Sequence, residues 1–267
     1  ESRPNWGAER AFAGLPPPFD LNDPTVRTLD LNGDKRIDFL RTTPYGFIYY
    51  YNRGGYWEED GLKLFGEPGL GDITAADGLE FSRPGPGGDV PNELVKLADM
   101  NGDRLLDLVR LTEFGDLIEI EFWPNKGRGA WGLRQPMRTA IDRAVVPIED
   151  VFVQDLNADG LADVVAVRFD AISLWINQGN FDFSAEFTIG NTPVYVRGET
   201  VLRQADINGN GSTDFLWENF DPAAGSFKIE FYDFLGASKP NLLTMIDNGI
   251  GLRTEIEYRT TTDFYLE

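Results

Sequence analysis

A nine-residue acidic segment that occurs four times is the feature that most constrains what this 267-residue chain can fold into. Each copy has oxygen-bearing side chains at its positions 1, 3, 5 and 9 and is followed by two apolar residues. The copies, which align without a gap, are Asp30–Asp38, Asp99–Asp107, Asp155–Asp163 and Asp206–Asp214. Self-similarity of this kind is typical of architectures that repeat one supersecondary unit, so we expect a repeat protein.

An aromatic segment follows each acidic segment and completes the repeat. Residues 49–54, 122–127 and 174–179 are rich in aromatic and apolar residues and end in Asn-x-Gly, whereas the fourth copy at 231–236 has lost the Asn. Each unit therefore contains an acidic loop, a strand, a turn, an aromatic strand and a Gly-rich return. A period of about 50 to 70 residues with three or four strands is the size of a propeller blade.

The remaining sequence favours an all-β fold. Short alternating or apolar runs bounded by Gly, Asn and Asp are typical of strands, and they lie at residues 47–51, 117–122, 172–176 and 227–232. We predict an all-β chain that forms a β-propeller. Four blades are marked by the acidic segment, and unmarked blades at the ends would bring the total to five or six.

Two stretches lie outside the regular pattern. Residues 61–88 lengthen the first interval and are rich in Gly and Pro, so we interpret them as a surface loop, a tolerated insertion in preference to a partner-binding loop. We assign residues 1–240 to the propeller and residues 241–267 to terminal strands. Neither end resembles a natural terminus or a signal peptide, which suggests a segment excised from a longer protein.

The oxygen pattern of the acidic loops predicts metal binding. Positions 1, 3 and 5 of a tightly turning loop can aim three oxygens at one point, the backbone carbonyl of position 7 can add a fourth, and position 9 closes the shell with a carboxylate. Ligation by oxygen alone favours Ca²⁺ over softer metals, so we predict up to four structural calcium ions. The candidate ligands are Asp30, Asn32, Asp34, Arg36, Asp38, Asp99, Asn101, Asp103, Leu105, Asp107, Asp155, Asn157, Asp159, Leu161, Asp163, Asp206, Asn208, Asn210, Ser212 and Asp214.

For a single copy, an Asx-rich turn with solvated carboxylates would be an equal alternative. Four copies with one pattern favour metal, because carboxylates crowded within nine residues repel one another unless a cation is present. The loops are not EF-hands, since position 12 lacks the bidentate Glu. Asn210 replaces Asp at position 5 of the fourth loop, so we expect that loop to bind calcium most weakly.

Composition excludes several classes of function. The chain has 44 acidic and 24 basic residues and a formal net charge of −20, which disfavours nucleic acids and anionic membrane surfaces as partners. It has no His and no Cys, which excludes Ser-His-Asp and Cys-His catalysis and thiolate zinc sites. No apolar run approaches the roughly 18 residues of a membrane span.

Two carboxylates that lie two residues apart, Glu119 and Glu121, could in principle perform acid–base hydrolysis. A solvated strand face explains them better, and we predict no enzyme.

The acidic loop, its two apolar residues and the aromatic strand that ends in Asn-x-Gly resemble the FG-GAP/VCBS calcium-loop blades of integrin-like propellers over about residues 26–236. The tail, with segments 241–251, 254–258 and 262–266, looks like the region after the propeller in the B component of bacterial insecticidal toxin complexes (Tc toxins) and in SpvB-like proteins. In those proteins this region leads into an Rhs-type shell.

The toxin resemblance implies a secreted, extracellular bacterial virulence protein. In that family the propeller docks on the pore-forming A component and gates passage of the effector, so the resemblance implies a protein-binding and gating module with no chemistry of its own. The alternative is a carbohydrate-binding propeller similar to FG-GAP-type lectins. Its candidate sugar-stacking residues, although aromatics at repeat-equivalent positions are more often blade core, are Trp57, Trp123, Trp131, Trp175 and Trp217.

Overall fold

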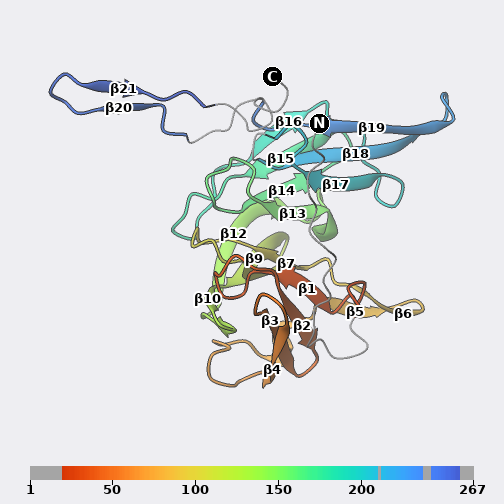
Figure 1. The fold of residues 1–267 in the computed structure, drawn as a ribbon. Helices are drawn as coiled ribbons and strands as arrows, with labels where there is room; N and C mark the ends of the chain where they lie inside the picture. Colours follow the sequence, from red (N-terminus) through yellow and green to blue (C-terminus); the bar gives the residue numbers. More distant parts are fainter. Residues whose placement is uncertain (1–19, 210–211, 237–241, 259–267) are drawn as a thin grey trace, which may run out of the picture. The chain divides into compact units, whose positions relative to one another are not determined.

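A computed structural model describes residues 20–209, 212–236 and 242–258 of the chain (Figure 1). Strands make up 48% of the structure. The described residues contain two 3₁₀-helices, η1 (Ala75–Asp77) and η2 (Ile148–Asp150), and no α-helix, which confirms the prediction of an all-β chain. Within this part of the chain, neither helix is long and apolar enough to cross a membrane.

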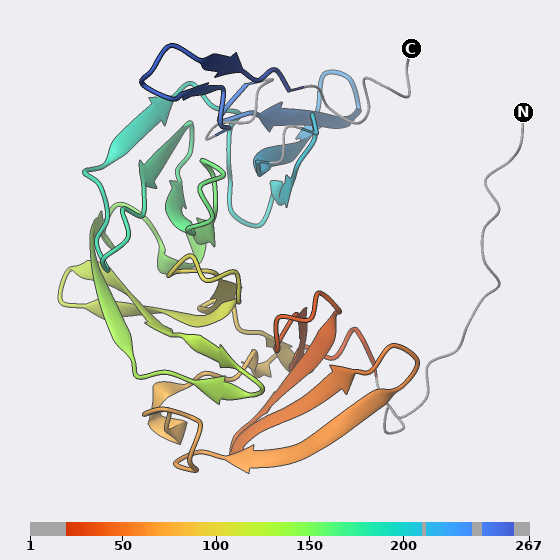
Figure 2. The same ribbon diagram turned by 60° about the vertical axis from the view of Figure 1, so that its left-hand side comes forward.

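The first sheet contains four antiparallel strands in the order β1-β2-β3-β4, drawn in red to orange in Figure 2. The strands are β1 (Val26–Leu29), β2 (Asp38–Thr43), β3 (Gly46–Asn52) and β4 (Trp57–Leu64). Leu29 pairs with Asp38, so the first acidic loop joins β1 to β2 and its position 9 begins the second strand. Side chains alternate along a strand, and β3 therefore places Phe47, Tyr49 and Tyr51 on one face.

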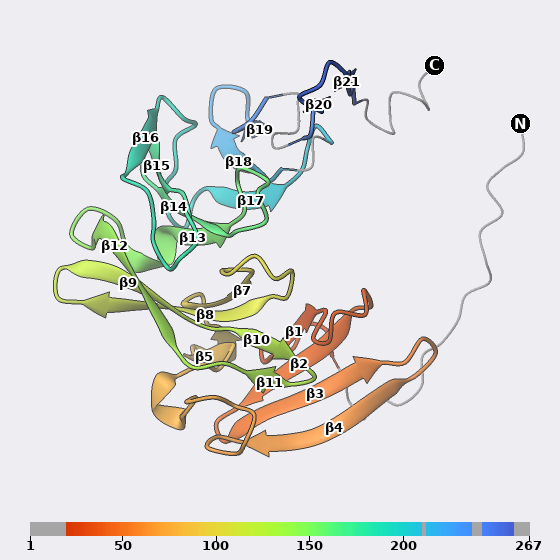
Figure 3. The same ribbon diagram turned by 90° about the vertical axis from the view of Figure 1, so that its left-hand side faces the viewer.

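Three further sheets repeat this plan (Figure 3). The second has the order β12-β9-β8-β7, the third β13-β14-β15-β16 and the fourth β17-β18-β19. In each, the acidic loop joins the first strand along the chain to the second. The strands are β7 (Val95–Ala98), β8 (Asp107–Phe114), β9 (Leu117–Trp123), β12 (Gln135–Asp142), β13 (Val151–Gln154), β14 (Asp163–Val167), β15 (Ala171–Trp175), β16 (Phe187–Gly190), β17 (Val201–Ala205), β18 (Asp214–Asp221) and β19 (Ser226–Tyr232).

Three two-stranded ribbons accompany these sheets. Their strands are β5 (Ser82–Gly85) with β6 (Gly88–Pro91), β10 (Asn125–Gly127) with β11 (Ala130–Trp131), and β20 (Met245–Asp247) with β21 (Arg253–Glu255). The strands predicted at 47–51, 117–122, 172–176 and 227–232 are all present. Successive antiparallel sheets of three or four strands are consistent with a β-propeller-like fold.

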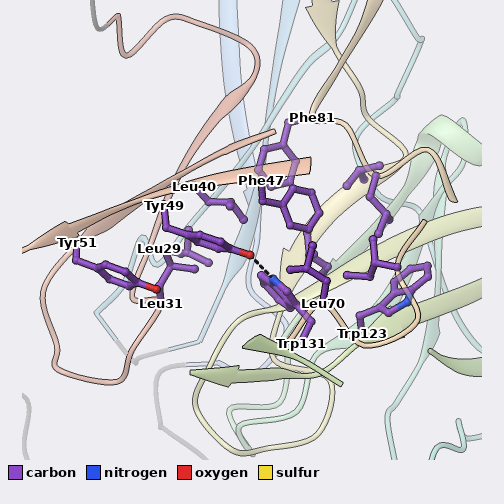
Figure 4. Packing of buried hydrophobic residues seen from close by; sticks show 14 residues of the cluster. Leu29, Leu31, Leu40, Phe47, Tyr49, Tyr51, Leu70, Phe81, Trp123 and Trp131 are labelled. Atoms are coloured by element: carbon purple, nitrogen blue, oxygen red, sulfur yellow. Dashed lines mark hydrogen bonds between the residues drawn. The ribbon is translucent and has the colours of Figure 1, made fainter. Parts of the chain in front are cut away.

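The chain divides into two compact units, which are described separately. The first comprises residues up to 97, 104–110 and 121–135, and the second residues 98–103, 111–120 and those from 136 onward. The core of the first unit includes Phe47 and Tyr49 of β3 together with Trp123 and Trp131 (Figure 4). The core of the second unit is built around Val165, Ile172, Phe215 and Trp217.

The segment 61–88 belongs to the core of the first unit. Leu70, Ile73, Leu79 and Phe81 are all at most 1% exposed. The interpretation of this segment as a tolerated surface insertion is therefore wrong. Its Gly and Pro residues lie in exposed stretches, among them 66–69 and the tip of the β5–β6 ribbon, that alternate with these buried apolar side chains.

Polar contacts also anchor this segment. Asp72 accepts hydrogen bonds from Trp123 Nε1 (2.9 Å) and from the backbone N–H of Arg134 (2.8 Å). Thr42 Oγ1 accepts the N–H of Phe81 (2.9 Å). Removal of the segment would expose the core and leave Trp123 Nε1 without its acceptor.

Candidate metal centres

Each acidic loop ends in an aspartate that begins the second strand of its sheet. These four side chains, Asp38, Asp107, Asp163 and Asp214, are all 0% exposed. A buried carboxylate is costly unless hydrogen bonds or a cation compensate it. Their surroundings therefore show what the loops are built to do.

In the first copy, both oxygens of this aspartate accept backbone hydrogen bonds. Asp38 Oδ2 accepts the N–H of Leu31 (3.0 Å), and Oδ1 accepts the N–H of Asn52 (2.8 Å) at the end of β3. Asn52 Nδ2 donates to the carbonyl of Ile37 (3.3 Å), and Asn52 Oδ1 accepts the N–H of Gly54 (2.9 Å). We call this set of bonds the clasp, because it ties the acidic loop to the end of the aromatic strand.

The third copy repeats the clasp. Asp163 accepts the N–H groups of Leu156 (3.0 Å) and Asn177 (2.9 Å). Asn177 Nδ2 donates to the carbonyls of Ala162 (3.1 Å) and Met100 (3.0 Å). The Asn-x-Gly motif is completed by the N–H of the Gly two residues further on, which Asn177 Oδ1 accepts at 3.0 Å.

The second copy makes the same contacts at the end of its aromatic strand. Asn125 donates its N–H to Asp107 Oδ1 (2.8 Å) and its Nδ2 to the carbonyl of Leu106 (3.2 Å), and its Oδ1 accepts the N–H of Gly127 (2.8 Å). The sequence shows Asn-x-Gly as a repeated motif, but the residues alone do not reveal that its Asn closes the acidic loop.

The fourth copy departs from the clasp because Phe234 stands at the strand position where the first and third copies have Asn. Asp214 Oδ2 still accepts the N–H of Ile207 (2.9 Å), but Asp214 Oδ1 is buried without a hydrogen-bond partner. Asp233 Oδ1 accepts the N–H of Gly236 (2.7 Å), and its Oδ2 accepts a hydrogen bond from Asn208 Nδ2 (2.7 Å). A carboxylate therefore reaches position 3 of this loop from outside the nine-residue segment.

The side-chain oxygens at positions 1 and 3 organise the loop backbone. Asp30 Oδ1 accepts the N–H of Gly33 (2.8 Å) and its Oδ2 accepts that of Lys35 (2.8 Å), while Asn32 Oδ1 accepts that of Asp34 (2.9 Å). The position-1 contact to the N–H of position 4 recurs at 2.7 Å in the second and fourth loops. These Asx turns give the loops their shape.

Position 4 requires a left-handed backbone, which explains its glycine. The φ angles are +78° at Gly33, +79° at Gly102 and +76° at Gly209, and Ala158 adopts +57° in the third loop. A side chain is strained in this region of φ, whereas glycine is not.

The structure also gives the position-7 side chains a packing role. Leu105 lies against Gly33 in the first unit, and Leu161 lies against Gly102 in the second. Small residues at position 4 therefore make room for the apolar side chain of the next loop.

Electrostatics in the loops is governed by burial and by neighbouring carboxylates. The pKa of Asp163 is raised to about 7, mainly by burial and also by the nearby Asp159 and Asp155, against the opposing effect of two backbone hydrogen bonds. Burial also raises the pKa of Asp38, with Asp34 and Asp30 adding to the effect. A cation in the loop would relieve this repulsion.

We tested whether the described residues fit a calcium ion. Nineteen of the twenty candidate ligands lie in the part of the chain that the structure describes, and Asn210 lies outside it. The donor set consists of carboxylate, amide and carbonyl oxygens, which are the ligands of Ca²⁺. The buried Oδ1 atoms of Asp155 and Asp214 have no hydrogen-bond partner, so each has a lone pair available. Among the described residues, no three acidic side chains lie at metal-binding distance from a common point. The chemistry of the donors fits calcium, with the carboxylates engaged on backbone N–H groups.

The aromatic and carboxylate candidates for other functions are structural. Trp57, Trp123, Trp131, Trp175 and Trp217 are all at most 7% exposed, so none presents a ring face for a sugar to stack on. Glu121 is also buried and forms ion pairs with Arg110 and Arg134.

Comparisons with known proteins agree with this fold. The FG-GAP-like repeat family matches residues 155–217, a stretch that includes the third and fourth acidic loops. No curated protein sequence matches the chain. The chain is similar in structure to an Agrocybe aegerita lectin that specifically recognises non-reducing terminal N-acetylglucosamine, with 19% identity, a TM-score of 0.51 and coverage of 78% of this chain and 52% of the lectin.

A second similarity is to TcdB2-TccC3, a Tc toxin assembly, with 16% identity, a TM-score of 0.53 and coverage of 90% of this chain and 16% of that one. The same protein without its hypervariable C-terminal region gives a TM-score of 0.51 at 16% identity, with coverage of 90% of this chain and 15% of that one. The chain thus spans about half the length of the lectin and a small part of the toxin protein. At these identities the similarities concern the fold, and they are consistent with the β-propeller-like architecture predicted from the repeat.

Proposed function

We propose that this chain is a calcium-stabilised β-propeller module that binds a protein partner. It would also gate the passage of an effector, as the propeller of a secreted bacterial toxin-complex B component would. The partner would be the pore-forming A-type component of such a complex. The observation that carries the binding part of the proposal is an exposed apolar face on the fourth sheet. The repeated clasp supports the calcium part.

The apolar face consists of Phe220, Phe227, Ile229 and Phe231, which are 51–67% exposed. Phe220 and Phe227 face each other across the β18–β19 pair with ring centroids 5.5 Å apart, and Ile229 and Phe231 follow on the same side of β19. Large contiguous apolar patches on soluble domains mark interaction sites. The opposite side of this sheet carries Phe215 and Trp217 and is buried in the core of the second unit.

Calcium would act as a structural element in this proposal. The candidate oxygens of each loop would close around the ion and hold the first two strands of a blade together, and no open coordination position is required for chemistry. The proposed activity is binding, with no enzymatic step.

The experiment measures binding of the chain to the purified A-type component by biolayer interferometry, with calcium present. We expect the Phe227→Ser/Ile229→Ser double variant to weaken binding at least tenfold with an unchanged melting temperature, because both side chains are exposed. Phe114→Ser removes a comparably exposed aromatic, 65% exposed on β8, and serves as the matched control. Binding that is absent from the wild-type chain, or equal in the double variant, would overturn the proposal.

A further inference from the structure

Strand β19 forms an edge of the fourth sheet at the place where the other three sheets have a further strand. In those sheets the third strand along the chain pairs with a fourth, which is β4, β12 or β16. Among the strands that the structure describes, none pairs with the outer side of β19 (Figure 1). None of its seven residues is buried, whereas β3 and β15, which hold the same place in their sheets, are mostly buried. An edge of this kind presents backbone N–H and C=O groups to a further strand.

The outer strands of the other sheets carry features that oppose pairing with another strand. β4 has three consecutive acidic residues, Glu58–Asp60, and its register against β3 shifts beside Gly61. β12 contains Pro136, and β16 has only four residues and ends in Gly190. Runs of like charge, bulges, proline and short length all protect an edge strand. β19 has none of these features, because it is seven residues long, lacks Pro and Gly, and has one Lys and one Glu.

The sequence of β19 is complementary to itself when two copies run antiparallel. With Ile229 opposite its own copy, Phe227 lies opposite Phe231, and Lys228 lies opposite Glu230. Aromatic pairs and opposite charges across two strands stabilise their pairing, whereas like charges destabilise it. A register centred on Lys228 or on Glu230 would place like charges opposite each other. The side chains therefore favour a single symmetric register.

The side chains of β19 are already arranged for this register. Lys228 Nζ pairs with Glu230 Oε1 of the same strand (2.7 Å), and 60% and 35% of these two side chains are exposed. In two paired strands, these ion pairs would come together as four charges, each beside two of opposite sign. Phe227, Ile229 and Phe231 lie on the other side of the strand and are 51–67% exposed. The same register would therefore join the apolar faces of two copies.

We infer that β19 is a self-association strand, which pairs antiparallel with β19 of a second copy of this chain in a register centred on Ile229. The three-stranded fourth sheets of the two copies then form one continuous sheet, and each copy closes the open edge of the other. A symmetric contact of this kind joins two copies and stops, so the product is a dimer and not a filament. The pairing uses the edge of β19, and it does not rest on the proposed toxin partner.

The first experiment measures the oligomeric state of the full chain with calcium by sedimentation velocity at a series of protein concentrations. A single strand pair is a small interface, so we expect a weak dimer with a dissociation constant of about 10–100 µM. Lys228→Glu and Glu230→Lys should each weaken dimerisation at least about tenfold, because each variant places like charges opposite each other twice. An equal mixture of these two variants should dimerise like the wild type, since opposite charges then meet again.

Arg253→Glu is the matched control for the charge variants. It makes the same change of charge in an exposed Arg–Glu pair two residues apart on β21, and it should leave dimerisation unchanged. A wild-type chain that stays monomeric at every concentration would mean that another segment of the chain or another partner covers the edge, and would overturn the inference. A mixture that dimerises no better than either variant alone would also overturn it.

Disulfide trapping tests the register, since the chain has no cysteine of its own. Ile229→Cys places a thiol opposite its own copy and should give a covalent dimer under mild oxidation. Phe227→Cys is the matched control, because the two side chains are 67% and 64% exposed. Its two thiols would lie about 14 Å apart along the strands, so it should cross-link at least about tenfold more slowly. Equal cross-linking of the two variants would overturn the inference.

Discussion

The third and fourth acidic loops carry the same nine-residue pattern, yet only the third is closed by a complete clasp. In the third copy, Asp163 accepts two backbone N–H groups and Asn177 bridges the loop to the aromatic strand. In the fourth copy, Phe234 stands at the Asn position and Asp214 Oδ1 is left without a partner. Asp233, the residue before it, places a carboxylate beside Asn208 of the loop. Closure of the third loop therefore depends on an Asn that lies 14 positions past the loop.

The largest expected effect comes from the aspartate that begins the second strand. Asp163→Ala would leave the buried N–H groups of Leu156 and Asn177 without acceptors, at a cost of about 3–5 kcal/mol of unfolding free energy. Asp214→Ala should cost only about 1–2 kcal/mol, because one of its oxygens has no partner to lose. Urea unfolding of both variants in EGTA measures the difference, and equal losses would show that the clasp does not distinguish the two copies.

The next largest effect should come from replacing the amide that closes the third loop with a carboxylate. Asn177→Asp removes the donors to the carbonyls of Ala162 and Met100 and adds a charge near Asp163, so we expect a loss of about 2 kcal/mol. The measurement is again unfolding free energy in EGTA. A variant as stable as the wild type would mean that the amide contributes nothing to closure.

The reverse change should have a smaller effect. Asp233→Asn would remove a carboxylate close to Asn208, and with it one of the charges that add to the effect of burial in raising the pKa of Asp214. We expect about 0.5–1 kcal/mol of added stability in EGTA, together with weaker calcium binding by the fourth loop. Lower stability of the Asp233→Asn variant in EGTA would contradict the expected gain. Tighter calcium binding by the variant would argue against a role for Asp233 beside that loop.

The smallest effect is expected at position 5 of the fourth loop. Asn210→Asp adds a carboxylate to the loop and should tighten its calcium binding by a few-fold without a change of more than about 0.5 kcal/mol in the metal-free protein. Calorimetric titration of calcium into wild type and variant measures this. Four identical sites in the wild type, or weaker binding by the variant, would contradict the assignment of position 5.

The sequence predicts the periodic part of this structure well. Four equivalent loops with alternating strands predict the all-β fold and the place of each loop between the first two strands of its sheet. The same repeat predicts that the blade tryptophans are buried in the core. Glycine at position 4 suits the left-handed backbone of the loop, which position 6 also adopts in the first three copies.

Non-periodic features could not be predicted in the same way. The segment 61–88 looks like a flexible insertion by composition, because burial of Leu70 or Phe81 depends on contacts with distant residues such as Trp123 and Thr42. The role of Asn177 is likewise a long-range one, since its partners belong to residues far apart in sequence. The loss of the Asn from the fourth copy is visible in the sequence, but the approach of Asp233 to Asn208 requires the fold.

The central claim is that calcium stabilises this chain through its acidic loops, and thermal unfolding of one preparation with EGTA and with excess calcium tests it most directly. Each site filled at a hundredfold excess over its dissociation constant contributes about 2.7 kcal/mol, so we predict a melting temperature at least about 5 °C higher with calcium. The Asp99→Ala/Asp155→Ala variant, which removes position 1 from two loops, should show a smaller increase. An unchanged melting temperature, in protein shown by elemental analysis to be metal-free before calcium is added, would contradict the claim.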